Sequence, residues 1–178
     1  IININMKAMF LDHDGVICLP TEFGSRHKKR KKAGRSNIIP LGYQKTIYDF
    51  DNFNKKAVKV LNEILIETNC KIVCSSDWRI NASIELLSEI YLTNNIIITQ
   101  PIDKTIVIDS NNNPDLESCR IFEIKEYLNN HPEITNYVVI DDLEMFEFNE
   151  NFIHCSRSFE GIKQTGLKEK IIKILNKI

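Results

Sequence analysis

One short stretch, residues 7–16 (Lys-Ala-Met-Phe-Leu-Asp-His-Asp-Gly-Val), constrains this chain more than any other. An apolar run ends in two carboxylates one residue apart, Asp12 and Asp14, and Gly15 follows directly. The run indicates a buried strand, and the glycine allows a sharp turn after it. Residues i and i+2 of an extended backbone point the same way, so the two carboxylates can face one point. Such closeness is costly unless a cation or a shared proton relieves the repulsion. The stretch therefore predicts metal binding or acid–base chemistry; an Asp-rich turn after a strand is the alternative.

Strand and helix patterns alternate along the rest of the chain. This alternation predicts an α/β fold: a Rossmann-like three-layer core with a mostly parallel, five-stranded sheet, in a single domain over residues 1–178. A further short β element is expected at 106–108. We expect strands at about 7–12, 71–75, 96–99, 137–140 and 152–155, and helices at about 52–67, 80–93, 116–130 and from 167 onward.

Polar residues end three of the predicted strands: Asp12 and Asp14, then Ser75, then the pair Asp141 and Asp142. Ligands of open α/β sheets bind outside the carboxyl ends of the strands, so we expect these side chains at one edge. Clustered carboxylates suit Mg²⁺. An aspartate can also attack phosphorus, a second carboxylate can exchange protons, and a serine hydroxyl can hold a phosphoryl oxygen.

The order of these segments resembles the haloacid dehalogenase (HAD) superfamily of phosphohydrolases. Residues 10–16 are similar to its first motif, which implies Asp12 as the nucleophile and Asp14 as the general acid/base. The backbone carbonyl of Asp14 would also bind the metal. Residues 73–75 are similar to the second motif, which ends in Ser75. Residues 138–142 are similar to the fourth, which implies Asp141 and Asp142 as magnesium ligands.

The third HAD motif is a lysine, sometimes an arginine, near the start of the helix before the fourth strand. Arg120 stands at about that position and is the favoured match, with Lys125 and then Lys104 as alternatives. An arginine keeps the charge of the motif but changes its geometry.

A narrower resemblance is to the HAD domain of Swiss Army Knife RNA-repair proteins, a group related to the 3′-phosphatase domain of polynucleotide kinase/phosphatase. In that group an arginine shortly after the second-motif serine contacts the substrate phosphate, and Arg79 is the residue here that could match it. The resemblance is carried by residues 75–79 (Ser-Ser-Asp-Trp-Arg), Gln100-Pro101, the pair Arg120 and Glu123, and Asp141-Asp142.

Residues 17–48 show no regular period and are predicted to form an irregular basic flap, smaller than a full cap domain. Its basic run, residues 26–35, holds seven of the 23 Lys and Arg residues, in a chain with 24 acidic residues and a net charge of −1. It predicts contact with phosphate backbones; a solvated loop or a nuclear-localisation-like patch is the alternative reading. The basic residues are Arg26, Lys28, Lys29, Arg30, Lys31, Lys32 and Arg35.

The five cysteines are odd in number and form no CxxC pair, which favours a reducing compartment over a disulfide framework. No apolar run is long enough to span a bilayer, and no signal peptide is apparent. These features predict an intracellular protein, cytoplasmic or, from the basic run, nuclear, with no membrane partner.

The sequence therefore predicts a Mg²⁺-dependent phosphomonoester hydrolase that acts on a phosphorylated substrate, with a polynucleotide end as the favoured one. The alternatives are a phosphatase for small nucleotides or phosphoproteins, and a catalytically inactive HAD relative that binds nucleic acid.

Overall fold

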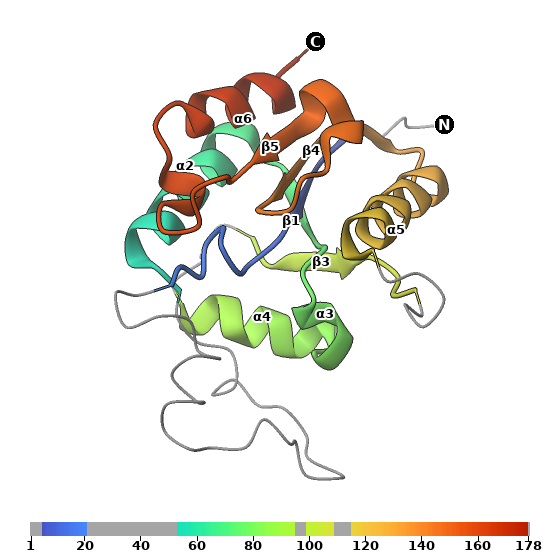
Figure 1. Cartoon of the computed structure of the whole chain (residues 1–178), viewed down its shortest axis with the longest axis horizontal. Helices are drawn as coiled ribbons and strands as arrows, with labels where there is room; N and C mark the ends of the chain where they lie inside the picture. The colour runs from blue at the N-terminus through green and yellow to red at the C-terminus, as the bar shows by residue number, and fades with distance from the viewer. Residues whose placement is uncertain (1–4, 21–52, 95–98, 109–114, 178) are drawn as a thin grey trace, which may run out of the picture.

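The computed structural model describes residues 5–20, 53–94, 99–108 and 115–177, and these form one α/β unit (Figure 1). The predicted fold class is confirmed: five strands form one sheet in the order β3-β2-β1-β4-β5, and every pairing is parallel. The strands are β1 (Met6–Leu11), β2 (Lys71–Cys74), β3 (Pro101–Lys104), β4 (Ile134–Asp141) and β5 (Phe152–His154).

Helices cover both faces of the sheet (Figure 1). The α-helices are α2 (Lys55–Thr68), α3 (Trp78–Asn81), α4 (Ile84–Thr93), α5 (Leu116–Asn130) and α6 (Leu167–Leu175), and two 3₁₀ turns are η3 (Phe146–Asn151) and η4 (Gly161–Lys163). The central strand divides its side chains between the two layers: Met9 and Leu11 pack with α2, α4 and α6, whereas Ala8 and Phe10 pack with α5 and η3. This alternation is the period-2 pattern of a strand buried on both faces.

Capping residues fix where the helices begin. Asn54 accepts hydrogen bonds from the backbone N–H groups of Lys56 and Ala57 at 3.1 Å, so α2 begins at Lys55. Ser83 caps α4 in the same way. The helix expected over 80–93 is therefore two helices, because the extended residue Ala82 ends α3 and Ser83 restarts the chain as α4.

The third strand was predicted in the wrong place. The strand beside β2 is Pro101–Lys104, Thr99 is not in a strand, and residues 95–98 lie outside the described residues. β3 is an edge strand, which needs few buried side chains and tolerates proline at its first position. The β element expected at 106–108 is also absent: these residues have no regular structure, and Ile106 and Val107 are exposed.

Two other expectations concern the predicted flap and the membrane. Residues 21–48 of the flap, with the whole basic run, lie outside the described residues, whereas Ile17, Cys18 and Leu19 are buried in the core. None of the helices in the described part of the chain has the length and apolar character that a membrane span requires.

The strand register sets the position of the functional residues. Leu11 pairs with Cys74 of β2 on one side and with Ile140 of β4 on the other. The residues that follow these three, Asp12, Ser75 and Asp141, therefore lie side by side at the carboxyl edge of the sheet.

The loop after β1 is held in place by a close backbone contact with η4. Gly161 has φ +53°, and a Cβ atom there would lie 2.2 Å from the carbonyl oxygen of Val16. Ile162 donates a backbone hydrogen bond to the same oxygen at 2.9 Å. Only glycine fits this contact.

We expect Gly161→Ala to lower the free energy of unfolding by about 2–4 kcal/mol, because a strained φ adds to overpacking. Gly166→Ala is the matched control: Gly166 has φ +85° with no atom within 4 Å of a Cβ, so the loss should be about 1 kcal/mol from strain alone. Urea unfolding of both variants measures the difference, and equal losses would contradict the contact.

Candidate active site

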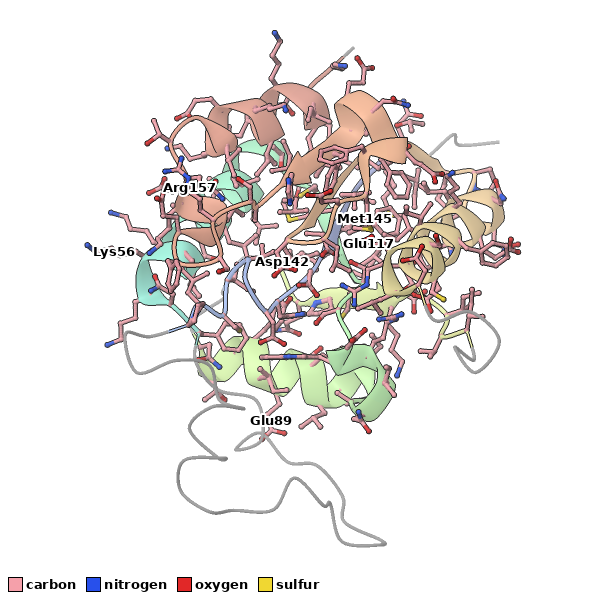
Figure 2. All side chains as sticks on the ribbon, viewed as in Figure 1. Lys56, Glu89, Glu117, Asp142, Met145 and Arg157 are labelled. Carbon is pink, nitrogen blue, oxygen red and sulfur yellow. The ribbon has the colours of Figure 1, made fainter. Side chains whose placement is uncertain are left out.

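Three carboxylates converge at the carboxyl edge of the sheet. One oxygen each of Asp12, Asp141 and Asp142 lies within 4.8 Å of the others. Asp12 and Asp141 are buried, and Asp142 is the most accessible of the three. Figure 2 shows Asp142 near the middle of the view, whereas Lys56, Glu89 and Arg157 project at the periphery. The predicted meeting of segments 129 residues apart is thus present in the structure.

Gly15 allows the third carboxylate to approach the loop after β1. Its φ is +80°, and a Cβ at this position would lie 2.4 Å from Oδ2 of Asp142. The glycine that follows Asp14 therefore serves both the turn and the packing of Asp142 against it.

The electrostatics of the cluster fit a divalent cation. Burial, followed by the charge of Asp141, raises the pKa of Asp12 well above its usual value, and Arg120 opposes this shift only in part. Burial and Asp141 likewise raise the pKa of Asp142 to about 6. Carboxylates that resist ionisation together are relieved by a bound cation, and an all-oxygen set of this kind suits a hard ion.

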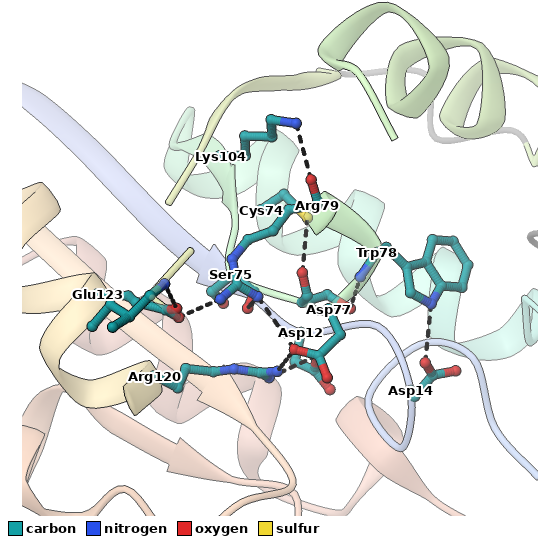
Figure 3. A network of polar contacts seen from close by, with 12 residues as sticks. Asp12, Asp14, Cys74, Ser75, Asp77, Trp78, Arg79, Lys104, Arg120 and Glu123 are labelled. Carbon is teal, nitrogen blue, oxygen red and sulfur yellow. Dashed lines mark hydrogen bonds and ion pairs between the residues drawn. The ribbon is translucent and has the colours of Figure 1, made fainter. Parts of the chain in front are cut away.

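Arg120 is the cation that the cluster itself contains (Figure 3). Its Nη1 donates to Oδ1 of Asp12 at 3.0 Å and to Oδ2 of Asp141 at 2.9 Å, and its Nη2 donates to Asp77 at 2.6 Å. Burial alone would lower the pKa of Arg120, but the three carboxylates raise it by more, so the pKa lies above its usual value. The guanidinium is therefore a permanent positive charge between two buried acids.

The two alternative cations lie elsewhere. Lys125 pairs with Glu147 at 2.6 Å on the exposed side of α5. Lys104 donates to the carbonyl oxygens of Arg79 and Ala82, at the end of α3. Of the three candidates for the third motif, Arg120 is the one that contacts Asp12.

Ser75 brings a hydroxyl group to the same edge. Its backbone N–H donates to the carbonyl of Leu11 at 3.2 Å, which fixes the residue beside Asp12. Its Oγ is fully buried and has no hydrogen-bond partner among the described residues, and Nε of Arg120 is in the same state. Buried polar atoms without partners are costly, and a ligand, ion or water bound at this edge would satisfy them.

The comparison with protein families agrees with this geometry. Residues 8–169 match the model of the HAD domain in Swiss Army Knife RNA repair proteins. The chain belongs to this family. The assignment indicates a phosphatase-type hydrolase, and HAD domains typically use a divalent metal. Comparison with curated proteins and with solved structures found no match.

Arg79 of this HAD domain, expected to contact substrate phosphate, lies in a buried network. Its Nη2 forms an ion pair with Glu123, its Nη1 donates to the carbonyl of Ser75 at 2.9 Å, and its Nε donates to the carbonyl of Ile106 at 3.4 Å. The other oxygen of Glu123 accepts from the N–H of Ile108 at 2.9 Å. In the structure, Arg79 thus helps to hold the backbone of Ser75 in place.

Asp14 stands apart from the carboxylate cluster. Its Oδ2 accepts a hydrogen bond from the indole Nε1 of Trp78 at 3.0 Å (Figure 3). His13, between the two motif aspartates, is fully buried, and its Nε2 pairs with the Tyr91 hydroxyl at 2.8 Å. Burial and the charge of Arg120 lower the pKa of His13 to about 3, so the imidazole is neutral at physiological pH.

Sequence reasoning assigned no role to Asp77 and Glu123, although both stand in the segments that carry the family resemblance. Asp77 bonds Arg120 from the turn after β2, and Glu123 bonds Arg79 from α5. The spacing of Arg120 and Glu123, three residues apart, was the available signal, because i and i+3 share a helix face.

Cation binding by this HAD domain should be sensitive to pH. Protons compete for the carboxylate of Asp142, whose pKa is about 6, so Mg²⁺ should bind about tenfold more weakly at pH 5 than at pH 7.5. Without a cation, the free energy of unfolding should fall as the pH rises from 3.8 toward 6, because the native carboxyl holds its proton longer than the unfolded one.

Calorimetric titration and thermal unfolding at both pH values measure these two effects. Asp142→Asn should weaken cation binding and flatten both pH dependences. Glu150→Gln removes an exposed carboxylate that pairs with Lys177 and should change neither. Equal affinity at pH 5 and pH 7.5 would contradict the assignment of Asp142 to the cation site.

Proposed function

We propose that this chain is a Mg²⁺-dependent phosphomonoester hydrolase that works through an aspartyl-phosphate intermediate on Asp12. One observation carries the proposal: the carboxylates of Asp12, Asp141 and Asp142 meet within 4.8 Å, and Arg120 bridges two of them. A nucleophile, a cation site and a fixed positive charge therefore share one point at the carboxyl edge of the sheet.

In the first step an oxygen of Asp12 attacks phosphorus. The bond between this oxygen and phosphorus forms while the bond from phosphorus to the leaving oxygen breaks, and Asp14 gives its proton to that oxygen. In the second step water attacks the phosphorus of the aspartyl phosphate and passes a proton back to Asp14. The bond between phosphorus and the Asp12 oxygen breaks, inorganic phosphate leaves, and Asp12 is regenerated as a carboxylate.

Two groups of the chain hold the transferring phosphoryl. The hydroxyl of Ser75 is buried beside Asp12 and has no other partner among the described residues, so it can donate to a phosphoryl oxygen. Arg120 supplies the positive charge, because positioning and charge stabilisation dominate phosphoryl transfer.

The metal-binding role belongs to the side chains of Asp12, Asp141 and Asp142 together with the backbone carbonyl of Asp14. Mg²⁺ bound there would neutralise charge on the phosphoryl oxygens and hold the substrate in line with Asp12.

The favoured substrate is a polynucleotide end. The family is described by its presence in RNA repair proteins, which supports a nucleic acid substrate. The predicted flap carries seven Lys and Arg residues between 26 and 35, and we propose that these contact phosphates of the same strand.

We expect the wild-type protein to hydrolyse 4-nitrophenyl phosphate with Mg²⁺ and Asp12→Asn to retain less than about a thousandth of that rate, because the nucleophile is lost. Asp12→Asn should also melt at a higher temperature than the wild type without Mg²⁺, because it removes a buried carboxylate whose pKa burial raises. Loss of activity in a more stable protein separates chemistry from folding.

A pair of variants on α5 provides the matched control. Arg120→Met should lower kcat about 100- to 1,000-fold, through loss of a charge at the phosphoryl group. Lys125→Met removes the same charge from the surface of the same helix and should keep the wild-type rate, because Lys125 pairs with exposed Glu147. Asp12→Asn at wild-type activity, or equal losses in the two helix variants, would contradict the mechanism.

The substrate class is tested by comparing kcat/KM for a 3′-phosphorylated oligonucleotide with that for a 3′-mononucleotide and a phosphopeptide. A polynucleotide phosphatase should prefer the oligonucleotide, and the preference should shrink as salt rises, because phosphate contacts release counterions. A higher kcat/KM for the mononucleotide or the phosphopeptide would contradict the polynucleotide assignment and identify that substrate class in its place. Oligonucleotide binding without turnover of any of the three would indicate an inactive HAD relative.

A further inference from the structure

The hydrogen bond between Trp78 and Asp14 joins two segments that are 64 residues apart. Asp14 lies in the loop after β1, and Trp78 begins α3 after β2. The contact has good geometry at 3.0 Å and reaches a single carboxylate oxygen, Oδ2. It therefore holds Oδ2 of Asp14 at hydrogen-bond distance from the indole.

The indole is itself held rigidly. Its ring stacks on the imidazole of His13, with centroids 4.5 Å apart and an angle of 6° between the planes. Phe53 meets another side of the indole edge-on at 5.5 Å. His13 in turn bonds the hydroxyl of buried Tyr91. The donor that reaches Asp14 thus belongs to a packed aromatic cluster, whose members lose few rotamers when they hold it in place.

The turn that carries Trp78 forms hydrogen bonds with both Arg120 and Asp14. Asp77 accepts a hydrogen bond from Arg120 at 2.6 Å, and the next residue donates to Asp14. A buried indole needs a partner for its N–H, and satisfying that need is the purely structural reading of the contact. That reading predicts no effect of Trp78 on proton transfer.

We propose that Trp78 is a positioning residue for Asp14, an inference that rests on the proposed function. The indole N–H holds Oδ2, so the carboxyl group presents its proton to the leaving oxygen of the substrate while the bond from phosphorus to that oxygen breaks. A misplaced acid transfers its proton poorly, because general acid catalysis requires hydrogen-bond geometry in the transition state.

If Trp78 positions Asp14, its loss should affect substrates whose leaving group needs a proton more than those whose leaving group does not. A loss of packing alone would affect both kinds of substrate equally. An alkoxide, as released from a nucleotide 3′-phosphate, is a poor leaving group and depends on protonation. The 4-nitrophenolate ion is stable without a proton and depends on it little. The value of kcat/KM reports events up to the first irreversible step, here formation of the aspartyl phosphate, so its ratio between the two substrates isolates the role of the acid.

The kinetic test uses Trp78→Phe, which keeps an aromatic ring on His13 and removes the donor. For the 3′-phosphate substrate, kcat/KM should fall about 10- to 100-fold, and for 4-nitrophenyl phosphate by less than about threefold. Inhibition by inorganic phosphate should be unchanged, because the proposed role of Trp78 is to position Asp14 and not to bind the phosphoryl group. Added to Asp14→Asn, the same substitution should have no further effect, because both changes remove one function.

Tyr127→Phe is the matched control. The Tyr127 hydroxyl donates to Oδ2 of Asp103 at 3.0 Å, an aromatic donor on a carboxylate in the packing of the opposite face of the sheet. Removal of this hydroxyl should leave kcat/KM unchanged for both substrates. Equal losses of Trp78→Phe on the two substrates, or no loss on the 3′-phosphate, would overturn the proposed role of Trp78.

A second measurement does not depend on activity. Trp78 is the single tryptophan of the chain, so its indole N–H gives one identifiable resonance in a ¹⁵N-correlation spectrum. Asp14→Ala should move this resonance upfield by clearly more than Asp103→Ala does. An unmoved resonance overturns the inference whatever the activity. A resonance that moves in a protein that hydrolyses neither substrate overturns the proposed function and leaves the contact standing.

Discussion

The repulsion among three carboxylates at the end of the central strand is the constraint on which the rest of this structure depends. Parallel register places Asp12 and Asp141 on neighbouring strands, and Gly15 lets Asp142 approach them. Arg120 offsets this repulsion only in part, since the pKa of Asp12 remains raised. The fold thus accepts an unfavourable cluster that a cation would relieve, as expected where binding rather than stability shaped a site.

The position of α5 over the sheet follows from the same need for charge. Arg120 and Glu123 are buried one turn apart on this helix, where an ordinary amphipathic helix would carry apolar residues. Arg120 pairs with Asp77, and Glu123 pairs with Arg79, so two ion pairs of opposite direction join α5 to the turn after β2. The Arg79–Glu123 pair is buried on both sides, so removing one partner is costly, whereas Asp77 is half-exposed. We infer that they set the register of α5, which brings Arg120 to Asp12.

Residues whose placement follows from local pattern could be predicted, and those placed by contacts between elements could not. Asp12, Ser75 and Asp141 follow apolar strands, so sheet topology alone brings them together. Arg120 and Lys125 both fit the spacing of the third motif; five residues apart, they lie on different faces of α5, and only the docking of the helix decides between them. Arg79 pairs with Glu123 because α5 docks there, a contact that local pattern does not reveal; its contact with substrate phosphate stays a prediction. The edge strand β3 was misplaced because its burial pattern is weak.

One short turn, residues 75–79, serves several elements because its residues point in different directions. The backbone passes here from the end of β2 through a turn into α3, so successive side chains leave it in different directions. Ser75 lies beside Asp12 at the end of β2, Asp77 reaches Arg120, and Trp78 reaches the loop after β1. Arg79 forms an ion pair with Glu123 of α5. A shift of this turn would displace a hydroxyl, a guanidinium and a carboxyl group together, so the rigidity of the aromatic cluster around Trp78 bears on the whole site. Large aromatic and guanidinium side chains suit this place because each spans the distance to a neighbouring element and still donates a directed hydrogen bond.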